Sequence, residues 1–155
     1  MDVDVRAGIG LPELLHGGIR FNISRAHYDF SLGGWPEQNR FSVSANYAHH
    51  FGNKWKTDLT PQPPWYMSWG GTYLFYRTDF IESHDVIFNA RMGRDFNILR
   101  SLSISVSLGI GATVYHDKFE LQSSNNSYDI YFPILPSGQF TIAYTFLKDI
   151  SDKED

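Results

Sequence analysis

The chain of 155 residues contains no cysteine. This absence excludes a disulfide framework, a thiolate metal site and a cysteine nucleophile. Charged side chains are also scarce: they make up 19% of the residues, whereas roughly a quarter is usual. The net charge is −4. A weakly acidic chain argues against a nucleic-acid-binding protein, which normally carries a basic stripe.

Long apolar runs are missing as well. No stretch approaches the roughly 18 apolar residues of a transmembrane helix, and the N-terminus, Met1 to Arg6, shows no basic region followed by an apolar one, so no signal peptide is visible. Two interpretations stay open at this point: a cytosolic protein, or a mature chain whose signal has been replaced by a start methionine.

Aromatic residues and glycine are abundant instead, and apolar residues recur at every second position. The clearest case is residues 102–114, where Leu, Ile, Val and Ala alternate with Ser, Gly and Thr. Period-two alternation is typical of β-strands. It predicts about eight strands, at 2–10, 15–24, 26–34, 39–51, 64–79, 83–97, 101–120 and 138–148.

The predicted organisation is a single β-barrel domain over residues 1–148, followed by a flexible acidic tail at 149–155. Two closed eight-stranded barrels fit this length. A soluble carrier barrel has its apolar residues inside, whereas a membrane barrel has them outside, facing lipid.

The second face of the strands favours the membrane barrel. In 101–114 this face carries only Ser, Gly and Thr, which suit a narrow barrel interior better than a water-exposed surface. Most predicted strands also reach the nine to eleven residues, roughly, that a tilted strand needs to cross a bilayer. The sequence therefore predicts an all-β, antiparallel, up-and-down, eight-stranded transmembrane β-barrel.

Aromatic residues are expected in two groups near the strand ends, where interfacial girdles lie in membrane barrels. The first group is Tyr47, Phe51, Trp55, Trp65, Tyr144 and Phe146; the second is Phe30, Trp35, Phe75, Phe80, Tyr115 and Phe119. An even strand number places both termini on one side, the periplasmic one. Outward loops are then expected at 11–14, 34–38, 80–84 and 121–137.

At this point the chain resembles the small eight-stranded outer-membrane barrels of Gram-negative bacteria, the OmpA/OmpX-like group. Three segments, 13–21, 47–52 and 90–98, resemble the Bacteroidota-type outer membrane proteins in particular. The resemblance implies an outer-membrane location, but no single activity, because this fold hosts anchors, adhesins, partner subunits and a few enzymes. One departure is that Phe146 is followed by more residues, whereas such barrels usually end at an aromatic residue.

Six charged residues fall on the predicted inward face, three of each sign: Asp4, Arg6, Arg20, Asp29, Asp85 and Arg91. The favoured interpretation is a lumen polar network in which paired charges satisfy one another; an ion path is the functional alternative. His27 and Asp29 share a face and could activate a nearby serine. Abundant serine makes such a triad easy to imagine, so no catalytic residue is predicted.

No metal site or cofactor is expected. His49 and His50 are adjacent and must point to opposite faces of a strand. His16, His84 and His116 are interpreted as isolated histidines of outer loops. The remaining candidate is loop 122–136, whose apolar residues suggest contact with a partner protein, lipid headgroups or the barrel mouth. These residues are Tyr128, Ile130, Tyr131, Phe132 and Ile134; alternatively, they extend the final hairpin.

The function expected from the sequence is that of a non-enzymatic outer-membrane protein, a structural or interaction module acting through its extracellular loops. Its partners would be outer-membrane lipid and another membrane or surface protein, contacted through loop 122–136, and not nucleic acid. The alternatives are a soluble lipocalin-like carrier of a small hydrophobic ligand and a lipid-modifying outer-membrane enzyme.

Overall fold

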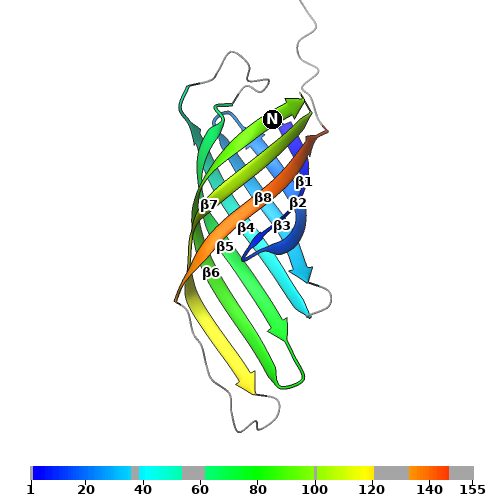
Figure 1. The fold of residues 1–155 in the computed structure, drawn as a ribbon, viewed down its shortest axis with the longest axis vertical. Coiled ribbons are helices and arrows are strands. Elements are labelled where there is room, and N and C mark those ends of the chain that lie inside the picture. The colour runs from blue at the N-terminus through cyan, green and yellow to red at the C-terminus, as the bar shows by residue number, and fades with distance from the viewer. Residues whose placement is uncertain (1, 36–38, 54–61, 100, 121–132, 147–155) are drawn as a thin grey trace, which may run out of the picture.

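The computed structural model describes residues 2–35, 39–53, 62–99, 101–120 and 133–146. These residues form a closed barrel of antiparallel strands in chain order, in which the last strand pairs with the first (Figure 1). The strands are β1 (Asp2–Leu11), β2 (Leu14–Ile23), β3 (Ala26–Trp35), β4 (Arg40–Phe51), β5 (Trp65–Arg77), β6 (Ile81–Leu99), β7 (Leu102–Glu120) and β8 (Ile134–Thr145). Within the described ranges, no helix is long and apolar enough to span a membrane.

The predicted all-β, eight-stranded, up-and-down barrel is thus confirmed, and most strand ends lie within two residues of the predicted ones. The exception is β8, which begins at Ile134 rather than at 138 because it pairs with β7 as far as Ala112. Ile134 therefore belongs to a strand and not to a loop, while the other predicted contact residues and the acidic tail 149–155 lie outside the described residues.

The β2–β3 and β6–β7 connections are short and lie at one end of the barrel, which the longer β4–β5 connection shares. Ile23 pairs with Ala26, so the β2–β3 turn contains only Ser24 and Arg25, and Ser24 has a φ of 55°. The same end holds the start of β1 and the close of β8, and we call it the terminal end; we call the other the distal end (Figure 1).

The strands are unequal in length at the distal end. β6 and β7 have 19 residues each, whereas β1, β2 and β3 have 10. As a result, β5, β6 and β7 project beyond the rest of the barrel, while the β1–β2 hairpin stops well short of them (Figure 1). We call the segments 73–77, 81–86 and 115–120 the distal projection.

The projection begins at an irregularity in the β6–β7 pairing. Val86 is opposite Tyr115 but Ile87 is opposite Thr113, so Val114 is an extra residue in β7. Two consecutive side chains, those of Val114 and Tyr115, are consequently exposed on the outer wall. A β-bulge of this kind increases local twist, and it separates the barrel wall from the projection.

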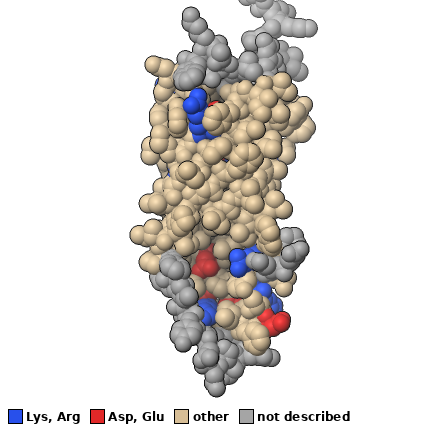
Figure 2. All heavy atoms as spheres, in the orientation of Figure 1, with Lys and Arg blue, Asp and Glu red and all other residues tan. Residues whose placement is uncertain are grey.

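The two faces of the strands differ sharply in chemistry. Large apolar side chains cover the outer wall; examples from five strands are Val5, Ile19, Phe30, Met67 and Leu108. On the face drawn in Figure 2, charged atoms gather near the two ends and leave the middle almost free of them. Alternation therefore gives mostly apolar side chains outside and mostly polar ones inside. Ile87 is the inward exception that the sequence indicates, and Ala48, Tyr66 and Ala143 are also buried.

The aromatic residues expected at the strand ends only partly lie there. Tyr28, Tyr47 and Trp69 form a row near the terminal end, with ring centroids 5.1 Å apart along it. Phe30 differs, because it lies at the middle of β3, opposite Ile19 and Ala45. Trp55 falls outside the described residues.

Candidate functional site: the polar interior of the barrel

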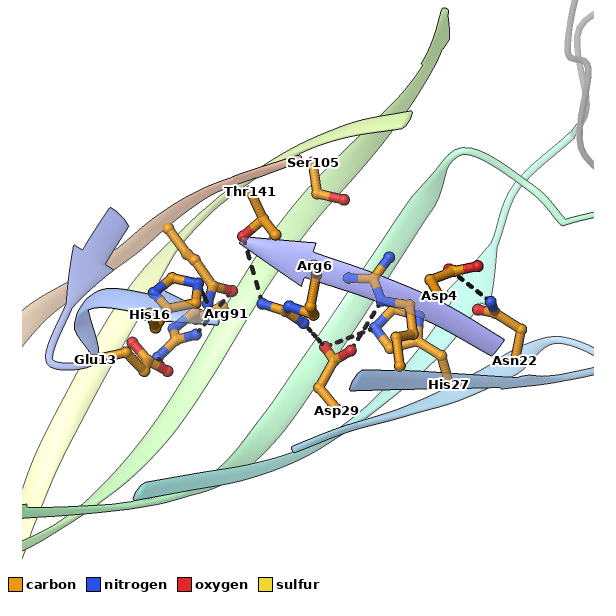
Figure 3. A network of polar contacts seen from close by, with 12 residues as sticks. Asp4, Arg6, Glu13, His16, Asn22, His27, Asp29, Arg91, Ser105 and Thr141 are labelled. Carbon is orange, nitrogen blue, oxygen red and sulfur yellow. Dashed lines mark hydrogen bonds and ion pairs between the residues drawn. The ribbon is translucent and has the colours of Figure 1, made fainter. Parts of the chain in front are cut away.

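The interior is filled with polar and charged side chains from all eight strands. Alternation directs these residues inward, and the narrow barrel buries them almost completely. They include Asp4, Arg6, Arg20, His27, Asp29, His50, Asn89, Arg91, Ser105, Ser107 and Thr141. Among the residues labelled in Figure 3, one group gathers around Asp29 and another around Arg91, and Asp4 pairs with Asn22 beside the first.

The first group, which we call the Asp29 cluster, lies in the half of the barrel nearer the terminal end. The Asp29 carboxylate forms ion pairs with Arg6 and, at 2.8 Å, with Arg20. Arg20 also lies 3.6 Å from the carboxylate of Asp95. Because these side chains are nearly inaccessible to solvent, each charge depends on its partners for compensation.

Two histidines extend the Asp29 cluster toward the terminal end. His50 Nδ1 lies 2.8 Å from the carbonyl oxygen of Pro63, so it donates. With its ring neutral, His50 Nε2 then accepts from His27 Nδ1, also at 2.8 Å. His27 Nε2 lies 3.4 Å from Asp29 Oδ2, so the chain of imidazoles ends at the carboxylate that both arginines contact.

The second group, which we call the Arg91 cluster, lies nearer the distal end. Arg91 forms an ion pair with Glu13 and donates to Ser137 Oγ at 2.6 Å. Ser137 Oγ in turn donates to the carbonyl oxygen of Leu11, and Ser42 Oγ donates to that of Glu13 at 2.8 Å. The β1–β2 turn is thereby tied to β4, β6 and β8 from inside the barrel.

Glu13 is a lumen residue that sequence reasoning missed. The sequence places 11–14 in an outer loop and does not include Glu13 among the lumen residues, but its side chain is 0% exposed and points into the lumen. No sequence pattern indicates this, because a glutamate after a proline in a turn is ordinarily a surface residue. The ion pair with Arg91 holds the Glu13 side chain inside the lumen.

The Glu13→Gln variant should loosen this turn. An amide keeps the shape of the side chain but removes the charge that compensates buried Arg91. We expect faster amide hydrogen exchange at residues 11–14 and unchanged exchange at the β2–β3 turn. Glu82→Gln, which alters an ion pair of the distal projection at 3.7 Å from Arg77, is the matched control. Unchanged exchange at 11–14 would show that the ion pair does not hold the turn.

The six charged residues predicted for the lumen do not form one network. Arg6, Arg20 and Asp29 meet in the Asp29 cluster, and Asp4 accepts from Asn22 Nδ2 at 2.8 Å near the terminal end. Arg91 belongs to the second cluster. Asp85 differs, because it lies in the distal projection, only partly buried, 2.5 Å from His116 Nδ1.

The histidines are also better connected than the sequence indicates. His16 is buried in the lumen, where its Nδ1 lies 3.1 Å from the Leu14 carbonyl oxygen and its Nε2 lies 2.9 Å from Gln139 Nε2. His84 lies 2.6 Å from the hydroxyl of Tyr73. The interpretation of His16, His84 and His116 as isolated loop histidines is therefore wrong, because they lie in β2, β6 and β7 and each has a side-chain partner.

Neither a metal centre nor a triad at His27 is assembled among the described side chains. No three His, Asp or Glu side chains among them are arranged to hold a metal ion. His27 is hydrogen-bonded to His50, and its other nitrogen faces Asp29 rather than a serine, so a hydrolytic triad is not assembled there. The paired charges of the interior join strands that are not neighbours in the sheet, such as β1 with β3 and β2 with β6.

Comparison with known protein families, with curated proteins and with solved structures finds no match to this chain. The fold and the chemistry of its two faces are therefore the observations from which a function must be argued.

Proposed function

We propose that this chain is a transmembrane β-barrel of a Gram-negative outer membrane, of the OmpA/OmpX-like kind and related to the Bacteroidota-type proteins. In this proposal it is a non-enzymatic structural or interaction module that contacts partners through its outer loops. The terminal end would face the periplasm and the distal projection would lie outside the cell.

The observation that carries the proposal is the distribution of side chains between the two faces. Many large apolar side chains of the outer wall are 38–71% exposed, whereas Arg6, Asp29 and His27 are buried inside. In water this arrangement would leave a large apolar surface unpaired. In a bilayer it is the favourable one, and closure pairs β8 with β1, so the barrel lacks the two full-length free edges that an open sheet would expose to lipid.

The same distribution argues against the soluble carrier. A lipocalin-like barrel holds its ligand in an apolar interior, but here Asp29, Arg6 and Arg20 occupy that position and pair with one another. The paired charges also argue against a wide ion path, because the lumen of an eight-stranded barrel is filled by its own side chains.

The distal projection supports a role in interaction. It carries polar and charged groups on an extension that the barrel does not need for closure, among them the Arg77–Glu82 ion pair and the Asp85–His116 contact. A water-exposed sheet of this kind suits a protein partner at the cell surface. The apolar residues of loop 122–136 adjoin it in sequence and belong to the same proposal.

The first test is refolding into detergent micelles, followed by gel electrophoresis with and without boiling. We expect a requirement for detergent and faster migration of the unboiled protein, because a closed barrel of paired strands resists unfolding by the gel detergent. A monodisperse protein in plain buffer, with no difference in migration, would refute the membrane assignment and revive the soluble carrier.

A further inference from the structure

The wall of the barrel has a gap at the distal end. β1 ends at Leu11, opposite Gly138, while β8 continues back to Ile134 without a partner on that side. On the other side of the gap, Trp35 of β3 extends past Gly34, the last residue of that strand with a partner in β2. The β1–β2 hairpin is thus too short to fill the space between β8 and β3 (Figure 1).

A groove of about 420 Å³ occupies this gap. We call it the lateral notch. Its lining is almost wholly apolar and contains no charged side chain; the residues are Ile9, Gly10, Leu11, Leu14, Trp35, Leu108, Pro136, Ser137 and Gly138. The volume lies within the range of about 300–1,000 Å³ that is usual for small-molecule sites, but the notch opens sideways, on the apolar wall.

The edge of β8 in the notch lacks one of the backbone donors that an added strand would need. Thr113 donates to the Pro133 carbonyl, and Phe146 donates to that of Val3. Alternation between hydrogen-bonding sides then directs the backbone of residue 136 away from β7, toward the notch. Proline has no N–H, so Pro136 removes the donor that an added strand would need there. The edge therefore disfavours an added peptide strand, and the apolar lining of the notch is the feature that suits a hydrocarbon chain.

The apolar surface beside the notch is also the least covered part of the described wall. Leu108 is 71% exposed and Ile134 is 67% exposed, the highest values among the described large apolar residues. Both adjoin the notch, one across the β7–β8 pairing and one along β8. Covering these two exposed side chains with another apolar group would therefore be favourable.

We propose that the lateral notch binds one acyl chain of a membrane lipid, oriented along the wall with Leu108 and Trp35 on its two sides. This inference rests on the proposed function, because the notch is continuous with the surface that would face lipid. The bound chain would cover the outer surface at the end of the β1–β2 hairpin. The Glu13–Arg91 ion pair holds the turn of the same hairpin from inside the barrel.

Gly138 provides a clean way to fill the notch. Its position faces outward, and an added Cβ would lie 3.1 Å from the flexible Leu108 Cδ2 and 3.5 Å from a backbone oxygen. The Gly138→Leu variant would place a side chain where the acyl chain is proposed to bind. Gly71→Leu is the matched control, because Gly71 is exposed on β5 and an added Cβ meets nothing within 4 Å.

The test uses vesicles that contain a phosphatidylcholine with a photoreactive diazirine in one acyl chain. After irradiation, labelled residues are mapped by mass spectrometry, and lipid retained by the protein in detergent is counted by native mass spectrometry. We expect labelling of the intact protein to be enriched at residues 9–11, 108 and 136–138, with one retained lipid. Gly138→Leu should lose both, and Gly71→Leu should keep both.

A graded variant guards against a folding defect. Gly138→Ala should reduce the labelling partially while preserving the heat-dependent gel shift. Uniform labelling of the whole wall, unchanged in Gly138→Leu, would overturn the notch as a binding site but leave the membrane barrel intact. If none of the proteins folds in vesicles or takes label on its outer wall, the proposed function itself fails, and the notch proposal fails with it.

Discussion

Replacing Asp29 with asparagine should destabilise the folded barrel by about 3–5 kcal/mol, the cost of leaving a buried charge without its partner. Asp29 is 5% exposed and compensates two arginines that are as deeply buried. Asparagine keeps the size of the side chain but not the charge. Arg20 would retain only Asp95 at 3.6 Å, and Arg6 would retain a long contact with the hydroxyl of Thr141 at 3.4 Å.

The measurement is urea unfolding in detergent or vesicles, with the folded fraction read from the heat-dependent gel shift. Asp117→Asn is the control, because Asp117 lies in the distal projection and accepts an exposed hydrogen bond from the Tyr115 hydroxyl at 3.1 Å. We expect a change in the free energy of unfolding within about 0.5 kcal/mol. The double variant Arg6→Met with Asp29→Asn should recover part of the loss, since one uncompensated charge is removed. Additive destabilisation in the double variant would contradict the role assigned to Asp29.

The second large effect is expected on the outer wall. Phe30→Arg should destabilise the barrel in a bilayer by about 2–4 kcal/mol, the cost of an arginine on the lipid face near the midplane. Phe30 lies at the middle of β3 and points outward, opposite Ile19 and Ala45. An arginine there would have apolar neighbours on both adjoining strands.

Phe119→Arg is a closely matched control, because Phe30 and Phe119 are both 53% exposed. Phe119 lies in the distal projection, opposite Glu82, where water would solvate the new charge. We therefore expect little change from Phe119→Arg in the same vesicles. Equal tolerance of both substitutions would mean that the middle of the wall is in contact with water, and would count against the bilayer.

Much of the fold can be predicted from the sequence because alternation is a local property. Leu102 to Val114 shows which side chains share a face, and each strand is found from its own residues. Asp95 could have been added to the lumen set in the same way, since it follows Arg91 by four residues in one strand and so lies on the same face.

The site is predicted less well, because pairing depends on three-dimensional proximity. Alternation directs Arg6 and Asp29 inward, but nothing in the sequence indicates that they meet while Asp85 pairs with His116 instead. The inward turn of Glu13 depends on the short β1–β2 hairpin and on the position of Arg91 three strands away around the closed barrel. The lateral notch likewise depends on unequal strand lengths, which become visible only once the register is known.

The closing contact between β1 and β8 joins the two ends of the chain: Asp4 lies opposite Thr145. Neighbouring hairpins need only short segments of chain to form, whereas this contact must bring together residues 141 positions apart. Contacts of high sequence separation form slowly, because the entropy of loop closure is lost before they stabilise the fold. Barrel closure is therefore expected to be the last event in folding. Until then the chain has two unpaired strand edges, and at that stage it is most prone to aggregation.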